Sequence, residues 1–302
     1  MKDLKEQIQE LKKERQAVIL AHYYVRDEVQ EIADYVGDSY YLAKVAASLT
    51  NQVIVFCGVA FMGESAKILN PEKTVLMPVA EADCAMAHMV SIEKIQQMRR
   101  DDPDICVVTY INSTAETKMY SDVCVTSSNA VKIVKALPNK RIFFVPDENL
   151  GRYVSQQVPE KEIILNDGFC PVHHELNAED VKRVRKAYPG VKILAHPECR
   201  QDVLEKADYI GSTSGIINYA TECTDQEFII ATEFGVLYEL QSKNPDKQFH
   251  PLREGMICGD MKLTTLENVC EALKNMSPEV VVEEETSKKA KLALEKMLEL
   301  AK

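Results

Sequence analysis

Three of the nine cysteines stand at nearly equal spacing and could bind one metal centre. Cys170 follows Cys84 by 86 residues, and Cys258 follows Cys170 by 88. Their surroundings are loop-like (EADCAMAH, NDGFCPVHH and GMICGDM), and the chain contains no CxxC motif. Three thiolates leave one metal position open, either at the free iron of a [4Fe–4S] cluster or in a three-cysteine zinc site.

The alternative for any single cysteine is a buried residue that behaves as a small apolar side chain. Three further cysteines lie in or beside apolar runs, and we interpret them as core residues: Cys57, Cys106 and Cys124. The equally spaced set differs from these because its neighbours are polar and loop-like. The spacing therefore favours a shared centre for the set.

Hydroxyl side chains open predicted helices at three equivalent places. Helix N-termini carry unpaired N–H groups and the positive end of the helix dipole, which suits a phosphate or a carboxylate. We expect four hydroxyl residues to contribute to anion binding: Ser39, Ser127, Ser212 and Thr213. Ordinary N-capping is the alternative for each of them taken singly.

Titratable side chains follow the predicted strands. His22 and His196 occupy equivalent positions, and Glu198 stands two residues after His196. Residues two apart in a strand point the same way, so this pair could share one side of a pocket and perform general acid–base catalysis. Other polar residues near these positions are further candidates: Tyr24, Tyr110, Asn112 and His173. A hydrogen-bonded structural histidine is the alternative for either imidazole.

Short apolar runs alternate with amphipathic segments in three passes along the chain. The first apolar run of each pass covers 17–24, 106–113 and 192–198, and each run ends in polar residues. About 16 residues after that polar end, a Ser/Thr segment opens a predicted helix. Alternating strands and helices indicate parallel sheets with covered faces. We therefore predict an α/β fold of three homologous Rossmann-like domains around a pseudo-threefold axis, with a central active site at the carboxyl ends of the strands.

The period sets the predicted domain boundaries. The repeats are 1–84, 85–170 and 171–258, and the remaining segment, 259–302, is expected to pack on the first repeat. No linker rich in proline, glycine or serine separates the repeats. We therefore expect the domains to pack tightly against one another.

Four local predictions accompany this arrangement. The apolar spacing over 29–36 predicts a helix that ends at Gly37. The run GMIC (255–258) is assigned to the strands of the third pass, and amphipathic helices are predicted over 265–275 and 288–300.

Composition excludes several function classes. The 302 residues include 36 basic and 47 acidic ones, and a net charge of −11 argues against binding to nucleic acid or to an anionic membrane. A charged N-terminus without an apolar signal core predicts a soluble, cytoplasmic protein. Nine cysteines in that compartment are expected to be thiols or metal ligands rather than disulfides. No P-loop, GxGxxG or GxSxG motif occurs.

Ten segments, in order, carry a resemblance to a known family: LAHYYVRDEVQEIADYVGDS, FMGESAKILNP, YINSTAETK, TSSNAV, PDENLGRYV, GFCPVHH, AHPEC, ADYIGSTSG, ATEFGVLYEL and MKLTTLENV. Together they resemble the quinolinate synthases, iron–sulfur enzymes of NAD biosynthesis. The resemblance spans almost the whole chain. It implies three stacked α/β domains and a [4Fe–4S] cluster on Cys84, Cys170 and Cys258, with one open iron acting as a Lewis acid. Two departures are Tyr23, where the family often has Asn, and FMGE in place of FMAE.

The reaction implied by the resemblance condenses iminoaspartate with dihydroxyacetone phosphate to give quinolinate, phosphate and water. Glu198 and Tyr24 would serve in acid–base steps, with His196 and Tyr110 as further catalytic candidates. The resemblance implies substrate contacts at His22, Ser39, Tyr110, Asn112, Ser127, His173, His196, Glu198, Ser212 and Thr213. It also implies a functional partner, an oxidase or dehydrogenase that acts on aspartate and supplies the imine.

Three other functions compete with this one. A different [4Fe–4S] hydro-lyase or an aldol-type enzyme would use the same open iron. A non-catalytic iron–sulfur or zinc sensor would need neither His196 nor Glu198. A plain small-molecule binding protein predicts no metal.

Overall fold

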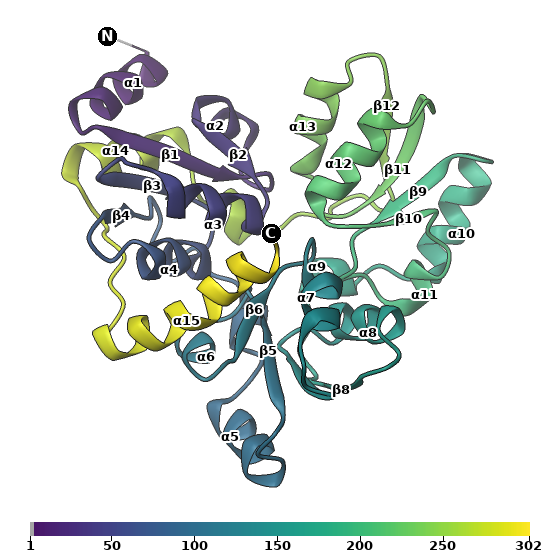
Figure 1. The fold of residues 1–302 in the computed structure, drawn as a ribbon. Helices are drawn as coiled ribbons and strands as arrows, with labels where there is room; N and C mark the ends of the chain where they lie inside the picture. Colours follow the sequence, from purple (N-terminus) through teal and green to yellow (C-terminus); the bar gives the residue numbers. More distant parts are fainter. Residues whose placement is uncertain (1–2) are drawn as a thin grey trace.

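Three four-stranded sheets, all parallel, form the framework of the chain, which a computed structural model describes over residues 3–302. Within each sheet, the strand that comes first in the chain lies between the second and the third, and the fourth lies beyond the third, so the same order recurs in each sheet. Figure 1 shows three lobes around a common centre, each with helices packed on its sheet. The predicted α/β class with three Rossmann-like parallel sheets is confirmed.

The first sheet is built from the N-terminal part of the chain. Its elements are α1 (Leu4–Glu14), β1 (Ala17–His22), α2 (Asp27–Ile32), β2 (Tyr35–Gly37), α3 (Ser39–Ser48), β3 (Val53–Cys57), α4 (Ala60–Leu69), β4 (Thr74–Leu76) and the 3₁₀-helix η1 (Ala85–His88). The helix predicted over 29–36 is present as α2, but its predicted end at Gly37 is wrong, because the helix ends at Ile32. The chain becomes extended at Ala33, and β2 pairs with the end of β1, from Leu20↔Tyr35 to His22↔Gly37. The strand pairing satisfies the backbone there, which the apolar spacing alone does not reveal.

The second and third sheets repeat this plan. The second contains α5 (Ile92–Asp101), β5 (Cys106–Tyr110), α6 (Ala115–Met119), β6 (Val123–Val125), α7 (Ala130–Ala136), β7 (Arg141–Val145), α8 (Glu148–Gln157) and β8 (Glu162–Leu165). The third contains α9 (Pro171–His174), α10 (Ala178–Ala187), β9 (Lys192–Ala195), α11 (Gln201–Leu204), β10 (Tyr209–Ile210), α12 (Thr213–Glu222), β11 (Glu227–Ala231), α13 (Val236–Lys243) and β12 (Gln248–Pro251).

The assignment of 255–258 to a strand of the third sheet is wrong. The last strand of that sheet is β12, which pairs in parallel with β11. Its sequence, QFHP, has a single large apolar residue and gives no clear strand pattern. Residues 256–258 instead form an irregular segment that leads to η2 (Asp260–Lys262).

Two helices follow the third sheet, as predicted, and return to the other lobes. They are α14 (Leu266–Asn275) and α15 (Glu284–Leu300). The first packs on α1 and β3, whereas α15 lies across α6, β6 and α4 and so joins the first two lobes. The boundaries 1–84, 85–170, 171–258 and 259–302 stay a prediction, and residues 1–2 lie outside the described part of the chain. None of the helices in residues 3–302 combines the length and the apolar character needed to span a bilayer.

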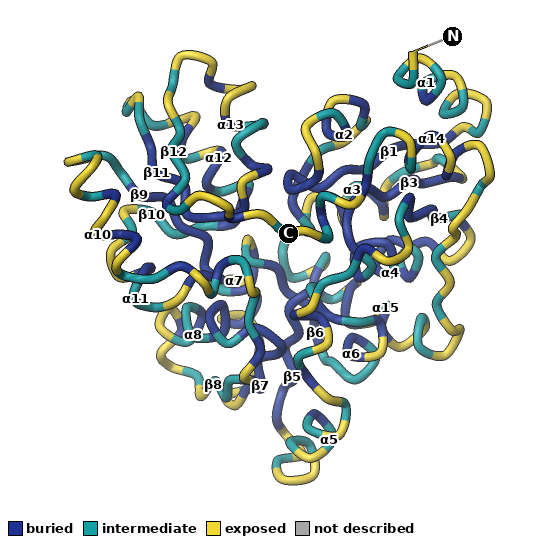
Figure 2. Tube along the Cα trace, turned by 180° about the vertical axis from the view of Figure 1, so that it is seen from behind, coloured by how far each residue is buried: buried dark blue, intermediate teal, exposed yellow. Residues whose placement is uncertain are grey.

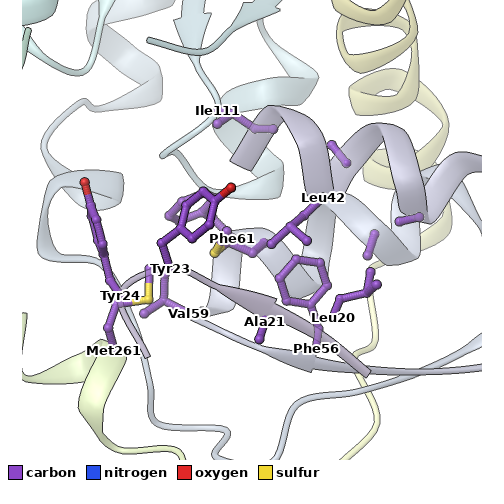
Figure 3. Packing of buried hydrophobic residues seen from close by; sticks show 14 of the residues in the cluster. Leu20, Ala21, Tyr23, Tyr24, Leu42, Phe56, Val59, Phe61, Ile111 and Met261 are labelled. Atoms are coloured by element: carbon purple, nitrogen blue, oxygen red, sulfur yellow. The ribbon is translucent and has the colours of Figure 1, made fainter. Parts of the chain in front are cut away.

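Apolar side chains on both faces of the strands form the core, and it extends up to the centre of the molecule. Figure 2 shows buried segments along the strands and toward the centre, with exposed residues mainly on the outer helices and loops. In the first lobe, Leu20 and Phe56 lie beneath Leu42 and Phe61, while Tyr24 stands at the end of β1 (Figure 3). The cysteines interpreted as core are buried in strands: Cys57, Cys106 and Cys124.

Candidate functional site

A cavity lies where the carboxyl ends of the three sheets meet. Its walls include residues from all three lobes: His22, Tyr24, Asp38, Ser39, Tyr40, Val59, Phe61, Asp83, Cys84, Met86, Tyr110, Asn112, Thr126, Ser127, Cys170, Val172, His173, His196, Glu198, Thr213, Glu233, Cys258 and Met261. The strands β1, β5 and β9, each second in its sheet, end at or just before His22, Tyr110 and His196. The position agrees with the rule that open α/β sheets bind ligands beyond the carboxyl ends of their strands.

The structure brings together all but one of the residues singled out from the sequence. The exception is Ser212, which does not line the cavity. Its hydroxyl caps α12 by accepting a hydrogen bond from Gly215 N at 3.1 Å, which is the ordinary N-cap role. The roles of the other residues in substrate binding and catalysis stay predictions.

Glu198 stands at the centre of a buried hydrogen-bond network. Tyr110 Oη donates to Glu198 Oε1 at 2.6 Å, and His173 Nδ1 lies 2.8 Å from Glu198 Oε2. Burial alone raises the pKa of the Glu198 carboxyl, but the net shift of this pKa is downward because His196, His173 and Tyr110 stabilise the carboxylate. Glu198 is therefore an ionised acceptor that orients the two donors.

The network continues through threonine hydroxyls to the first lobe. His173 Nε2 lies 2.9 Å from Thr232 Oγ1, and Tyr24 Oη lies 2.7 Å from both Thr232 Oγ1 and Thr213 Oγ1. One consistent assignment has His173 donating through Nδ1 to the carboxylate and accepting at Nε2 from Thr232, which in turn accepts from Tyr24. A continuous proton-carrying chain thus links Tyr110 to Tyr24.

The two tyrosines of this hydrogen-bond network, Tyr24 and Tyr110, remain protonated at neutral pH. Burial, reinforced by Glu198, raises the pKa of Tyr110 well above its usual value. Burial likewise raises the pKa of Tyr24 well above its usual value, although its two threonine partners oppose the shift. Each phenol therefore keeps its single proton, which Tyr110 donates to Glu198 and which Tyr24 can donate either to Thr232 or to a group in the cavity.

His22 and His196 are held in the same way in two different lobes. The backbone N–H two residues later donates to Nδ1 of each ring: Tyr24 N to His22 at 3.2 Å, and Glu198 N to His196 at 3.4 Å. The proton of each neutral ring therefore resides on Nε2, and in His196 this atom lies 3.2 Å from Ser127 Oγ. Burial lowers the pKa of both His22 and His196 to about 3, although Glu198 acts in the opposite direction.

The proximity of His196 and Glu198 does not arise from the strand geometry that was predicted for them. Strand β9 ends at Ala195, and both residues lie in the turn after it. His196 Nδ1 is 3.8 Å from Glu198 Oε2 because the turn folds the carboxylate back toward the ring. The two side chains meet, but for a different reason.

The two neutral histidines predict a fall in stability on acidification. In the folded chain both rings stay neutral down to about pH 3. In the unfolded chain the same two histidines bind protons below their usual pKa of 6.5. Unfolding therefore takes up protons, and the stabilisation present above pH 6.5 declines as the pH falls toward 3. Thermal unfolding midpoints across this range check it. His196→Gln should show a shallower decline than the parent, and equal slopes would contradict the prediction.

Hydroxyls at two helix starts face the same cavity. Ser39 is the first residue of α3, after the N-cap Asp38, and Thr213 is the first residue of α12. Each helix has ten residues, so its dipole favours an anion at the cavity. One N–H group of each helix is already bonded to its N-cap, Tyr41 N to Asp38 and Gly215 N to Ser212. Ser127 does not begin a helix, since α7 starts at Ala130 with Asn129 before it, and its hydroxyl instead contacts His196.

The three equally spaced cysteines, Cys84, Cys170 and Cys258, lie around the same two cavities. All three line the central cavity and also a second cavity beside it, so their thiols stand between the two. Burial raises the pKa of Cys84 to about 12 and raises the pKa of Cys170 and Cys258. Such thiols stay protonated until a bound cation displaces the proton.

The spacing of the sulfur atoms bears on what they could hold. A single tetrahedral zinc ion, with bonds near 2.3 Å, would bring its thiolates to about 3.8 Å from one another. Within residues 3–302 the three sulfurs do not all lie within 4.8 Å of one another, whereas Cys170, His173 and Glu198 offer ligand atoms that do. As they stand in the described residues, the three sulfurs are therefore too widely spaced to bind one single ion.

The sequence did not single out Glu233, which lines the cavity, or Thr232, which is hydrogen-bonded to two residues that line it. Thr232 joins Tyr24 to His173, and Glu233 accepts a hydrogen bond from Cys258 N at 3.1 Å. Both follow β11 directly, as His22 ends β1. Their position after a strand is the signal that could have found them, since the first strand of each repeat also ends in polar residues.

The protein is a multidomain α/β enzyme. Its three parallel-sheet domains enclose a buried acid–base network beside three thiols, which is the arrangement of an active site between domains. Known proteins agree with this class. A family model described as Quinolinate synthetase A protein matches residues 6–299. The chain belongs to this family.

Proteins named quinolinate synthase are similar to the chain over nearly its whole length. The protein of Clostridioides difficile (strain 630) is 52% identical over 300 residues, which cover 99% of this chain and 99% of the relative. The protein of Fusobacterium nucleatum subsp. nucleatum is 53% identical over 298 residues, with 99% of each chain covered. That of Caldicellulosiruptor bescii is 53% identical over 297 residues, with 98% of each covered.

Proposed function

We propose that the chain condenses iminoaspartate with dihydroxyacetone phosphate to form quinolinate. The observation that carries the proposal is the buried hydrogen-bonded chain from Tyr110 through Glu198, His173 and Thr232 to Tyr24, set beside the three thiols. The relatives named quinolinate synthase support the choice of product.

The reaction requires proton transfers but no oxidant. One iminoaspartate and one dihydroxyacetone phosphate yield one quinolinate, one phosphate and two waters, so the atoms balance without a change in total oxidation state. Ring formation needs protons removed from carbon and nitrogen and delivered to the oxygens that leave. A cavity with tuned acids and bases is suited to such steps.

Glu198 and Tyr24 are the acid–base residues of the proposal. The Glu198 carboxylate holds the Tyr110 hydroxyl and the His173 ring in donating orientations. Tyr24, protonated and linked to Thr213 and Thr232, would deliver a proton to a leaving oxygen. The neutral rings of His22 and His196 would bind polar groups of the substrates through Nε2.

The anionic groups of the substrates would lie at the helix starts. Ser39 and Thr213 offer hydroxyls and backbone N–H groups from α3 and α12, and Ser127 adds a hydroxyl beside His196. Asn112 Oδ1 is buried without a hydrogen-bond partner in residues 3–302, so Asn112 has an acceptor to offer a ligand. A closed site of this kind would protect the imine from water.

Cys84, Cys170 and Cys258 would hold a [4Fe–4S] cluster, whose fourth iron would act as a Lewis acid toward a substrate oxygen. The type of the three ligands and their common position beside two cavities support this group. The protein would work in the cytoplasm on small-molecule substrates, with an aspartate oxidase or dehydrogenase as the source of the imine.

Product analysis tests the proposal. The anaerobically purified chain is supplied with dihydroxyacetone phosphate and with iminoaspartate generated in place, and quinolinate and phosphate are quantified. We expect the two products in equal amounts. Iron-loaded protein that forms no quinolinate would refute the proposal and leave a different hydro-lyase, an aldol-type enzyme or a sensor.

A further inference from the structure

A buried acid stands at the same topological position in the second and third sheets. Strand β7 ends at Val145 and strand β11 at Ala231, and the acids Asp147 and Glu233 come two residues after each end. Both strands are third in their sheets. Each acid precedes the cysteine that ends its repeat, by 23 residues for Asp147 and by 25 for Glu233.

Glu233 contacts the segment that carries Cys258. Its side chain is 1% exposed; Oε1 accepts a hydrogen bond from Cys258 N at 3.1 Å, and Oε2 accepts one from Gly235 N at 2.6 Å. The carboxylate therefore fixes the backbone of the cysteine itself, next to the thiol.

Lys262 ties the same segment to the first lobe. Its ammonium lies 3.3 Å from Glu233 Oε1 and donates to the backbone oxygen of Tyr24 in a short hydrogen bond. Gly235 allows this approach, because a Cβ there would lie 2.6 Å from Lys262 Nζ and 2.8 Å from Tyr24 Cα. One ion pair, in which Glu233 is buried and Lys262 is partly exposed, thus connects the cysteine segment to the backbone of Tyr24.

Asp147 shows a related arrangement at Cys170. It is fully buried, and its Oδ1 accepts from Leu150 N at 2.7 Å. Burial and the nearby Glu198 raise the pKa of Asp147 well above its usual value, and the backbone N–H groups of Leu150, Asn149 and Cys170 oppose this shift. Its Oδ2 has no hydrogen-bond partner in the described residues.

The first sheet lacks an acid at this position. Val59 stands there, 25 residues before Cys84, and the backbone N–H of Cys84 instead donates to Asp83 Oδ1 at 2.7 Å. Each of the three cysteines thus has an acidic side chain near its own backbone N–H. The second and third sheets place that acid at an equivalent position, which points to a common purpose.

We propose that Glu233 is a positioning residue for Cys258, and that its ion pair with Lys262 holds the thiol segment in place for the bound cluster. The inference rests on the cluster site of the proposed function and does not depend on which substrates react. Partners of this kind orient metal ligands, and their loss commonly weakens metal binding by about 10- to 100-fold.

The test compares four anaerobically reconstituted proteins: the parent, Glu233→Ala, Glu233→Gln and the control Glu227→Gln. Glu227 lies in the same strand and pairs with His250 near the surface, away from the cysteines. The measurements are iron and sulfide per chain, the rate of iron release to a chelator, and the alkylation rates of Cys258 and Cys84 in the apo-protein.

We expect Glu233→Ala to release iron about 10-fold faster or more. We also expect its Cys258, but not its Cys84, to be alkylated faster than in the parent. Glu233→Gln retains one acceptor oxygen, so its release rate should fall between the two, and Glu227→Gln should match the parent. Parent-like iron release and alkylation in folded Glu233→Ala would overturn the inference; if that variant fails to fold, a parent-like Glu233→Gln would do so.

The readouts also separate this inference from the proposed function. A parent that binds iron but makes no quinolinate refutes the proposed reaction and leaves the iron-release comparison valid. A parent that binds no iron refutes the cluster site, and unchanged Cys258 alkylation in Glu233→Ala would then refute the positioning role as well.

Discussion

Replacement of Cys170 by serine is expected to abolish both iron binding and quinolinate formation while the chain remains folded. The cysteine lies between two cavities with Cys84 and Cys258, and serine offers a much poorer ligand to iron than a thiolate. The loss of one of three ligands should therefore release the cluster rather than weaken it slightly. Iron and sulfide analysis under anaerobic conditions, together with quinolinate assays, measures both effects.

Cys223→Ser is the matched control for this experiment. Cys223 is a half-buried free thiol at the end of α12, and its Sγ contacts Asp225 rather than the central cavity. The control should keep the iron content and turnover of the parent. Circular dichroism should show that Cys170→Ser is folded, because Cys170 stands before the short helix α9 and outside the sheets. Full iron content or turnover in folded Cys170→Ser would contradict the cluster site.

The three-lobed fold could be predicted because its signals are local and repeated. The buried strands β1, β5 and β9 are short apolar runs in the sequence. The polar residues at their ends recur at nearly constant spacing. Parallel sheets follow from this alternation, and the central cavity follows from the rule on strand ends. The equal spacing of Cys84, Cys170 and Cys258 then indicates a shared centre without any coordinates.

The elements that could not be predicted depend on pairing across the sheet. Strand β2 exists because its backbone bonds to β1, although its apolar residues continue a helical spacing. Strand β12 is an edge strand with little apolar pattern of its own. In both cases the tertiary partner decides the conformation, and a single segment does not contain that information.

The network was only partly foreseeable for a related reason. Residue types and strand ends indicated Glu198, His173 and Tyr24, but Thr232 is an unremarkable residue in the sequence. It becomes important only because its hydroxyl lies within hydrogen-bond distance of both His173 and Tyr24, which are far from one another in the chain. Contacts between distant segments of this kind carry no periodic signal.

Glu198→Gln is expected to lower kcat by about 100-fold or more while iron binding stays at the level of the parent. General acid–base groups contribute about 10²- to 10⁴-fold to rate. Glutamine keeps the shape of the side chain but replaces one carboxylate oxygen with a donor, which then faces either Tyr110 or His173. Both of these groups donate to the carboxylate now. One of the two donors must therefore lose its acceptor, and the hydrogen-bonded path from Tyr110 to Tyr24 is interrupted.

Two comparisons decide whether the effect belongs to the acid–base chain. Tyr110→Phe removes one donor and leaves the carboxylate bonded to His173, so its kcat should fall less than that of Glu198→Gln. Glu227→Gln removes a carboxylate that pairs with His250 outside the cavity and should leave kcat unchanged. Iron content must be measured on every variant, since Glu198 and Cys170 offer ligand atoms within 4.8 Å of one another. Loss of iron in Glu198→Gln would show that the residue acts through the metal site. Full turnover with full iron content would remove Glu198 from the catalytic proposal, because a proton path that passes through its carboxylate could not do without it.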